Sequence, residues 1–229
     1  MDLEEAKEKI IENNEKISEL LRQNEELLRE VGGNLDINEW YRIKIPNGYI
    51  HNTTYFYEKY HLEEIVKTWQ VQANIAYSFQ LSDFYNYLFN RFNIWGSVII
   101  MFYKNAIINL VSIFEALLFE CANNICVCPK ECGKVKECKK HFSGEQRNNS
   151  LRALSRLRDL GIVDYTEEKM ERIREIIGLR NRIHIRLAEN SEFNSADFCV
   201  SLHDEVFALI QDLSEDIYKN GVKMYYNCG

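Results

Sequence analysis

The segment LRNRIHIR, residues 179 to 186, brings together side chains that can hold a phosphate and move a proton. Arg180 and His184 are four residues apart, and Asn181 follows the arginine directly. A guanidinium binds a phosphate through two parallel hydrogen bonds and stabilises negative charge that develops on it. An imidazole, with an ordinary pKa of about 6.5, exchanges protons near neutral pH. The pair therefore suits cleavage of a phosphodiester bond.

A long helix, opened by a capping arrangement of Asp164 and Glu167, is predicted to position this pair and to run through Leu187. At about 100° per residue, the helix has an apolar stripe of residues three or four apart. The stripe contains Met170, Ile173, Ile177, Arg180, His184 and Leu187. Asn181 lies at its edge, whereas Arg182 points away from it.

A cation on an apolar helix face is costly unless it is paired, so Arg180 needs an explanation. One alternative is structural: an inward acid neutralises Arg180, and His184 is a hydrogen-bonded core residue. Glu115, in the preceding apolar helix, is a candidate for that acid, or else a partly exposed residue at its helix margin. The functional alternative is favoured because the arginine and histidine lie one helical turn apart beside Asn181.

The arrangement of helices around this motif resembles the HEPN superfamily, over about residues 82 to 219. The resemblance is carried by a long apolar second helix, NAIINLVSIFEALLFE, and by LRNRIH late in the penultimate long helix. Such domains are commonly metal-independent endoribonucleases, often toxins or antiviral effectors, and many act as dimers. The resemblance implies an RNA substrate and, as a further partner, an antitoxin or other regulatory protein.

The resemblance also implies roles for individual residues. Arg180 would contact the scissile phosphate, His184 would transfer protons, and Asn181 would be the polar residue after the arginine. The reaction would be attack by the RNA 2′-hydroxyl, leaving a 2′,3′-cyclic phosphate. The family motif usually separates its arginine and histidine by more residues than the three found here. Side chains at i and i+4 still converge on one helix face, but the alternative is a catalytically inactive HEPN-like binding or scaffold module.

A Cys- and Lys-rich insertion, residues 125 to 145, offers a second kind of chemistry. Zinc prefers four Cys or His ligands, and short loops between such ligands are ordered by the metal. The best ligand set is Cys128, Cys132, Cys138 and His141, with Cys126 as a substitute. The alternatives are a structural zinc and free thiols, and no metal is expected in catalysis. Basic residues predicted to contact the RNA backbone are Lys134, Lys136, Lys139, Lys140 and Arg182.

Composition indicates a globular chain without a generally basic surface. The 229 residues are 46% hydrophobic and carry a formal net charge of −7. The basic residues concentrate between 128 and 186, where a polyanion is most easily bound. No basic and apolar leader opens the chain, and the apolar stretch from 94 to 121 is interrupted by polar residues. We therefore expect a cytoplasmic protein with a core helix and no membrane span.

Residues 1 to 33 predict a long helix with seven-residue periodicity. One core position holds Leu3, Ile10, Ile17, Asn24 and Val31, and the other holds Ala6, Asn13, Leu20 and Leu27. Either this helix forms a coiled coil that makes a homodimer, or it packs on its own domain. Asn24 in a core position favours a register-matched dimer, and Gly32 and Gly33 end the helix.

The remaining segments complete a mostly α fold: a HEPN-like helical bundle with the long N-terminal helix and a small β-hairpin. The hairpin is predicted around Asn47-Gly48 within a connecting region of residues 34 to 81. Helices are expected at about 58 to 92, 97 to 122, 147 to 160 and 197 to 218, and the HEPN-like domain at 82 to 219. The residues expected to face inward are Ile99, Tyr103, Ala106, Leu110, Ile113 and Leu117 in the helix at 97 to 122, and Phe198, Leu202, Val206, Leu209, Leu213 and Ile217 in the last helix.

Overall fold

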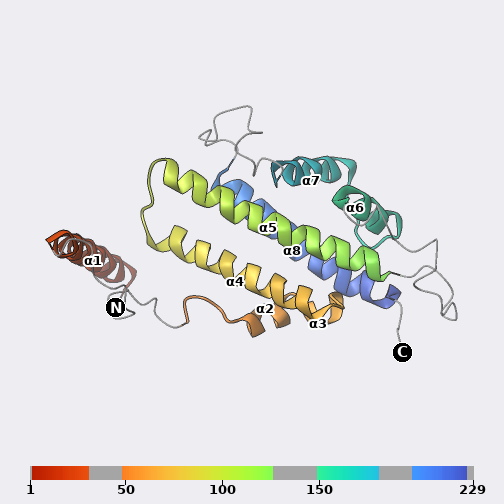
Figure 1. The fold of residues 1–229 in the computed structure, drawn as a ribbon, viewed down its shortest axis with the longest axis horizontal. Helices are drawn as coiled ribbons and strands as arrows, with labels where there is room; N and C mark the ends of the chain where they lie inside the picture. Colours follow the sequence, from red (N-terminus) through yellow and green to blue (C-terminus); the bar gives the residue numbers. More distant parts are fainter. Residues whose placement is uncertain (1, 31–47, 126–148, 181–197, 226–229) are drawn as a thin grey trace. The chain divides into compact units, whose positions relative to one another are not determined.

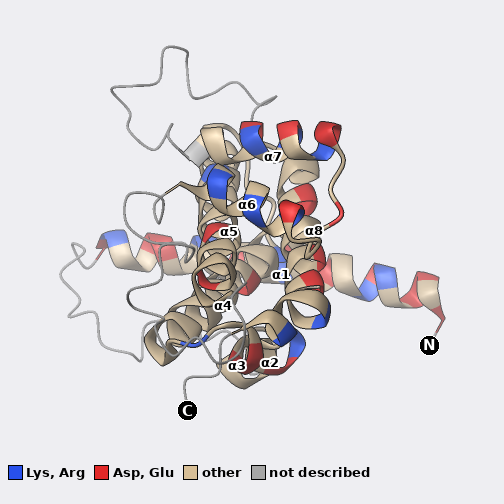
Figure 2. Ribbon diagram, turned by 90° about the vertical axis from the view of Figure 1, so that its right-hand side faces the viewer, with Lys and Arg blue, Asp and Glu red and all other residues tan. Residues whose placement is uncertain are grey.

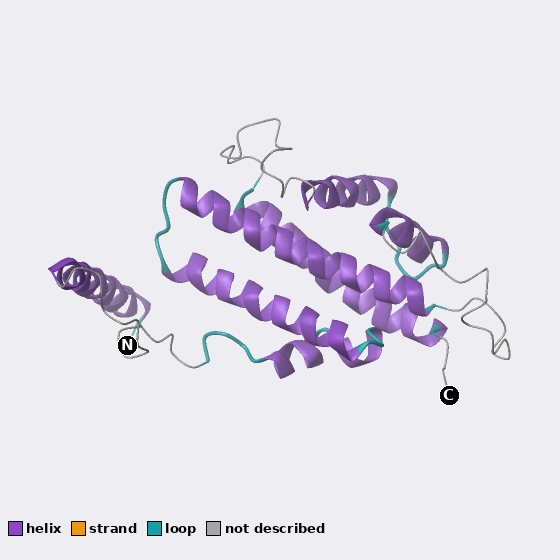
Figure 3. Ribbon diagram, viewed as in Figure 1, coloured by secondary structure: helices purple, strands orange, loops and turns teal. Residues whose placement is uncertain are grey.

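The computed structural model describes residues 2–30, 48–125, 149–180 and 198–225, and all that follows concerns these residues. The chain divides into two compact units, Met1–Pro46 and Asn47–Gly229. The described residues are mostly helical and include no strand, which confirms the mostly α class (Figure 3). The first unit contains one helix, α1 (Leu3–Glu30), within its described part.

The second unit is built around three long helices that lie side by side (Figure 1). They are α4 (Trp69–Arg91), α5 (Ser97–Asn124) and α8 (Val200–Asp216). Two short helices, α2 (Thr53–Lys59) and α3 (Leu62–Ile65), pack against α4, and α6 (Ser150–Asp159) and α7 (Glu167–Arg180) pack against α5. The predicted boundary between residues 81 and 82 falls inside α4.

Helix α5 is the centre of the bundle, in contact with α4, α6, α7 and α8. By length and composition alone it could cross a membrane, but in this structure its apolar residues supply much of the bundle core. The predicted inward residues Ala106, Leu110, Ile113 and Leu117 are buried, and Ile99 and Tyr103 are partly buried. Because these four helices and α3 contact it, α5 is apolar on most of its faces.

The predicted inward residues of the last helix are also confirmed. Phe198, Leu202, Val206, Leu209, Leu213 and Ile217 are all buried. Beyond Asp216 the helix continues as a π-helical turn, Ile217–Gly221, and a 3-10 turn, Val222–Met224. Tyr225 then donates its hydroxyl proton to the Ile65 carbonyl at 2.8 Å, so the end of the described chain is tied to α3.

The ends of α6 and α7 explain how the chain turns between them. Gly161 adopts a φ of 67°, and its N–H and that of Ile162 donate to carbonyls in the last turn of α6, as the predicted end at Gly161 requires. The predicted capping of α7 by Asp164 and Glu167 is wrong. The Thr166 hydroxyl accepts from the Lys169 N–H at 3.2 Å, so the helix begins at Glu167.

The predicted β-hairpin is not confirmed. Its first arm lies outside the described residues, and the second arm is replaced by a turn and bends at 48–50 followed by α2 from Thr53. The reason is local: the Asn52 side chain accepts a hydrogen bond from the Tyr55 N–H at 3.0 Å and caps α2. His51 secures this start against α4, because its N–H and its Nδ1 both contact Asp83 Oδ2.

Candidate functional site

Most of the side chains predicted from the sequence to form a site lie outside the described residues. This applies to Asn181, Arg182 and His184, to Lys134, Lys136, Lys139 and Lys140, and to the ligand set Cys128, Cys132, Cys138 and His141. Arg180 is the last residue of α7, where its backbone is helical. The structure therefore describes the two elements next to the predicted site: α7, which ends at Arg180, and α8, which begins shortly after Phe198.

Helix α7 presents its predicted apolar stripe to the bundle core. Met170 and Ile173 are buried, and Ile177 is partly buried against the core. Ile176, which the predicted stripe omitted, is also buried. The docked face is therefore wider than predicted, and Arg180 follows Ile177 and Ile176 by three and four residues, one helical turn further on.

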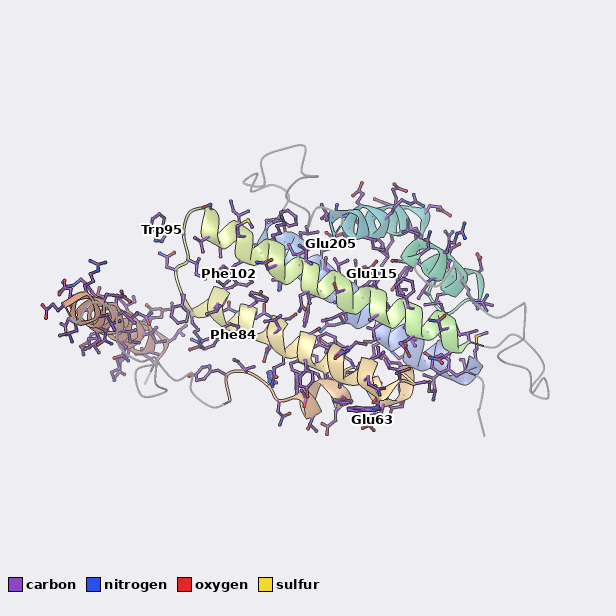
Figure 4. The ribbon with its side chains drawn as sticks, in the orientation of Figure 1. Glu63, Phe84, Trp95, Phe102, Glu115 and Glu205 are labelled. Atoms are coloured by element: carbon purple, nitrogen blue, oxygen red, sulfur yellow. The ribbon has the colours of Figure 1, made fainter. Side chains whose placement is uncertain are left out.

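A two-point ion pair fixes α7 to α8. Arg172 Nε and Nη2 donate to the two carboxylate oxygens of Glu205 at 2.8 Å each, and Nη1 donates to Glu175 at 2.8 Å. Figure 4 shows Glu205 between α7 and α5. The guanidinium lowers the pKa of the Glu205 carboxyl, and the two carboxylates raise the pKa of Arg172. This pair sets the rotation of α7 about its axis.

A shallow groove of about 400 Å³ runs between α7 and α8 beside this pair. Its lining residues are Thr166, Glu168, Lys169, Arg172, Ile173, Glu205, Ala208, Leu209 and Asp212. The Lys169 ammonium pairs with Asp212 at 3.0 Å and lies 4.1 Å from the Tyr165 ring centroid. Lys and Arg alternate with Asp and Glu along α7 (Figure 2). This groove is therefore not a positively charged channel for a polyanion.

The first turn of α8 carries a thiol in a polar setting. Cys199 is the N-cap residue, and its Sγ lies 3.0 Å from the Ser201 hydroxyl oxygen. Hydrogen bonds from the Ser201 side chain and from the Leu202 backbone lower the pKa of this thiol, and the charge of Arg172 contributes further. Cys199 is partly exposed, so its sulfur is accessible to small reagents.

Two buried polar side chains, Lys104 and His203, lie beneath this turn. Lys104 is 4% exposed, and its ammonium is 6.0 Å from the Phe198 ring centroid. His203 is also 4% exposed, and its Nδ1 is 3.1 Å from the Asp204 carboxylate. Its Nε2 is buried without a hydrogen-bond partner among the described residues, and its ring meets those of Phe89 and Tyr103 edge-on.

Glu115 lies on the side of α5 that faces α6 and α7 (Figure 4). It is 5% exposed, so the interpretation of this residue as a partly exposed acid at the helix margin is wrong. It accepts a hydrogen bond from the Ser150 hydroxyl at the start of α6. The Glu115–Ser150 bond joins α5 to α6, a role that the sequence did not indicate.

Within the described ranges, no group of three or more His, Cys, Asp or Glu side chains is placed to hold a metal ion. Comparison of the chain with family models, curated proteins and solved structures gives no match. A function for this chain is therefore inferred from its fold and its sequence motif alone.

The described residues bring a set of reactive groups to the start of α8, namely Cys199, His203, Lys104 and Tyr103. Burial raises the pKa of the Tyr103 hydroxyl, and the charges of Asp204 and Cys199 contribute. Sequence reasoning missed His203, although a signal existed: His203 precedes Val206, which was assigned inward, by three residues, and this spacing places both on one face of the helix. In the chain, the end of α7 and the start of α8 flank residues 181–197, which include Asn181 and His184 and lie outside the described residues.

Proposed function

We propose that this chain is a HEPN-like, metal-independent endoribonuclease that cleaves RNA by attack of a 2′-hydroxyl on the adjacent phosphate. The observation that carries the proposal is that the motif Arg180-Asn181-Arg182-Ile183-His184 begins at the last residue of α7, a helix docked by its apolar stripe on the core of an all-helical bundle. The docking of α7 favours a fixed position for the backbone of Arg180, which a residue that orients a substrate requires.

In this proposal Arg180 holds the non-bridging oxygens of the scissile phosphate and stabilises their charge as the phosphorane forms. His184 exchanges a proton with the attacking 2′-hydroxyl or the leaving 5′-oxygen. The 2′-oxygen forms a bond to phosphorus, the bond to the 5′-oxygen breaks, and the proton lost by the first oxygen balances the proton gained by the second. The products are a 2′,3′-cyclic phosphate and a 5′-hydroxyl end. Asn181 contributes a polar contact to the phosphate.

The surrounding segments have supporting roles in the proposal. Lys134, Lys136, Lys139, Lys140 and Arg182 contact the RNA backbone, and the set Cys128, Cys132, Cys138 and His141 holds a structural zinc. A toxin or antiviral setting, with an antitoxin or other regulator as partner, follows from the resemblance. Metal content can be measured on the purified chain and on Cys132→Ser, where about one zinc per chain should be lost.

A second candidate function is a non-catalytic binding or scaffold module. It is favoured by one observation: Lys169 and Arg172, bases on the exposed side of α7, are already paired with Asp212, Glu205 and Glu175. Such pairing leaves less positive charge for RNA on this helix. In the scaffold alternative His184 is a structural residue.

The test is cleavage of total RNA by the full chain with EDTA present, followed by analysis of product ends. We expect cyclic phosphate ends from the wild type and a loss of about 10²-fold or more for His184→Ala and Arg180→Ala. Arg186→Ala is the matched control, because the sequence pattern predicts that position 186 lies off the apolar stripe, and it should retain cleavage. Folding of each variant is checked by thermal unfolding. A folded wild type that leaves RNA intact would favour the scaffold alternative.

A further inference from the structure

Helix α1 presents an apolar stripe to solvent along its whole length. None of its 28 residues is buried. The stripe contains Leu3, Ile10, Ile17, Leu20 and Leu27, which are 69%, 54%, 52%, 59% and 58% exposed. At 1.5 Å per residue the helix is about 42 Å long. An apolar stripe of this length on a helix that buries nothing is a docking surface.

The spacing of the stripe identifies the kind of partner. Leu3, Ile10, Ile17 and Asn24 recur every seven residues, and Ala6, Asn13, Leu20 and Leu27 form the second core position. The ion pairs of α1 leave both core positions free. They join Lys9 to Glu5, Lys16 to Glu12, and Arg22 to Glu19 and Glu26. The partner that such a seam fits is another helix with the same repeat.

We propose that the partner is a second copy of this chain, and that the two α1 helices pair parallel and in register. The argument rests on Asn13 and Asn24, the polar residues of the seam. In the parallel arrangement each asparagine faces its own counterpart in the second copy, so the two amides hydrogen-bond to each other across the seam.

Two antiparallel registers keep most of the seam in contact. With Ile10 opposite Leu20 of the second copy, Asn24 faces Ala6 and Asn13 faces Ile17, so each asparagine loses water without gaining a hydrogen-bond partner. With Asn13 opposite Asn24 the amides are paired, but Leu3 and Ala6 then face no residue of α1 in the second copy. The parallel arrangement is favoured because it pairs both asparagines and also keeps Leu3 and Ala6 in the seam.

The first experiment measures the mass of the full chain in solution by sedimentation equilibrium. We expect twice the chain mass of 27.1 kDa for the wild type. Ile17→Asp should weaken the dimer at least about 100-fold, because it buries a charge in the seam. The matched control is Ile11→Asp, which changes a residue of similar exposure, 59%, outside both core positions. It should leave the dimer unchanged.

Each other outcome overturns part of the proposal. A monomeric wild type would mean that the stripe is covered by the chain itself or by a different protein. A dimer that survives Ile17→Asp would be held by another surface. Equal loss in Ile11→Asp and Ile17→Asp would exclude the assigned seam. Thermal unfolding of each variant checks that the chain is still folded.

The orientation is tested by mixing variants with opposite charges. Asn24→Lys and Asn24→Glu should each be monomeric or weakly dimeric, because like charges meet in the seam of each homodimer. Their mixture should form a heterodimer at least about 10-fold tighter than either homodimer if the helices are parallel. In the matched control, Asn24→Lys is mixed with Asn13→Glu, whose opposite charges meet only in the antiparallel arrangement that places Asn13 opposite Asn24. Restoration in the control mixture alone would overturn the parallel register.

Discussion

Arg172 on α7 and Glu205 on α8 are joined by two parallel hydrogen bonds of 2.8 Å, although 33 residues separate them in the chain. Both side chains are partly exposed, at 46% and 35%, so water screens their attraction. The bonds nevertheless hold the helix that ends at Arg180 at one rotation against the bundle. We therefore expect the Arg172–Glu205 pair to fix the orientation of α7 more than it raises the stability of the fold.

The Arg172–Glu205 pair should contribute about 0.5–1 kcal/mol of coupling in a double-mutant cycle of Arg172→Ala and Glu205→Gln. Because the pKa of Glu205 is lowered in the folded state, its stabilisation is present above the ordinary carboxyl pKa of 4.5 and is lost as pH falls below it. Urea unfolding of the four proteins at neutral pH and at about pH 3 measures the change.

Arg174→Ala is the control for this cycle, because Arg174 lies on the same helix and pairs with Glu171 within α7. Loss of that pair should cost no more than about 0.5 kcal/mol. An equal effect of Arg174→Ala and Arg172→Ala would argue that the pair between helices has no special role.

Two glycines should respond to alanine with opposite signs. A Cβ at Gly221 would lie 3.1 Å from Cys121 Sγ and 3.3 Å from Ile217 Cγ2, whereas a Cβ at Gly178 meets nothing within 4 Å among the described residues. Gly221→Ala should therefore destabilise the fold by about 1–3 kcal/mol. Gly178→Ala should stabilise it by about 0.5–1 kcal/mol, since glycine weakens a helix interior. Thermal unfolding of both variants checks the signs.

Because the hydrogen bond between Ser150 and Glu115 is buried, its removal should lower the free energy of unfolding more than truncation of a serine usually does. Ser150→Ala removes one donor to a carboxylate that is 5% exposed and should cost about 1–3 kcal/mol. Ser214 is the matched control, because it is also buried but donates only to the Gln211 carbonyl in its own helix. Ser214→Ala should cost about 0.5–1 kcal/mol. Similar losses, measured by urea unfolding, would mean that the Glu115 carboxylate is satisfied without Ser150.

Spacing along the chain predicted the faces of the helices well. The residues expected to face inward from three- and four-residue steps are buried in α8, and in α5 they are buried or partly buried. The buried face of α5 is wider than that stripe and also includes Ile107, Val111 and Phe114, because helices pack on several of its sides. The hairpin prediction was wrong at its second arm because alternation around Asn47 and Gly48 competes with the Asn52 cap of α2. A cap depends on two neighbouring residues and forms locally, so it prevails over a weak strand pattern.

Contacts between helices could not be predicted in the same way. The pairing of Arg172 with Glu205, and of Ser150 with Glu115, depends on how far one helix is displaced along another, which spacing within each helix does not determine. For the candidate site, the sequence predicted that Arg180 lies on a helix, and α7 includes it. The predicted stripe through Met170, Ile173 and Ile177 is confirmed. The roles of Asn181 and His184 stay predictions, outside the described residues.

Two described cysteines should differ strongly in reactivity. Cys121 is fully buried, and burial raises the pKa of its thiol to about 12. Cys199 is partly exposed, and its hydrogen bonds lower its thiol pKa from 9.0. Because the thiolate is the nucleophile, iodoacetamide at about pH 7.5 should modify Cys199 in the folded chain and Cys121 only after unfolding in urea. Peptide mapping by mass spectrometry resolves both sites.

The Ser201 hydroxyl is the largest cause of the lowered pKa of Cys199, so its removal gives a sharper test. Ser201→Ala should slow alkylation of Cys199, because its thiolate then forms at higher pH, while Ser201→Thr keeps a hydroxyl and should preserve the rate. The pH dependence of the rate separates this effect from a change in access, which would lower the rate equally at every pH. A rate profile that is the same in the wild type and Ser201→Ala would assign the lowered pKa to the helix N-terminus and Arg172 instead.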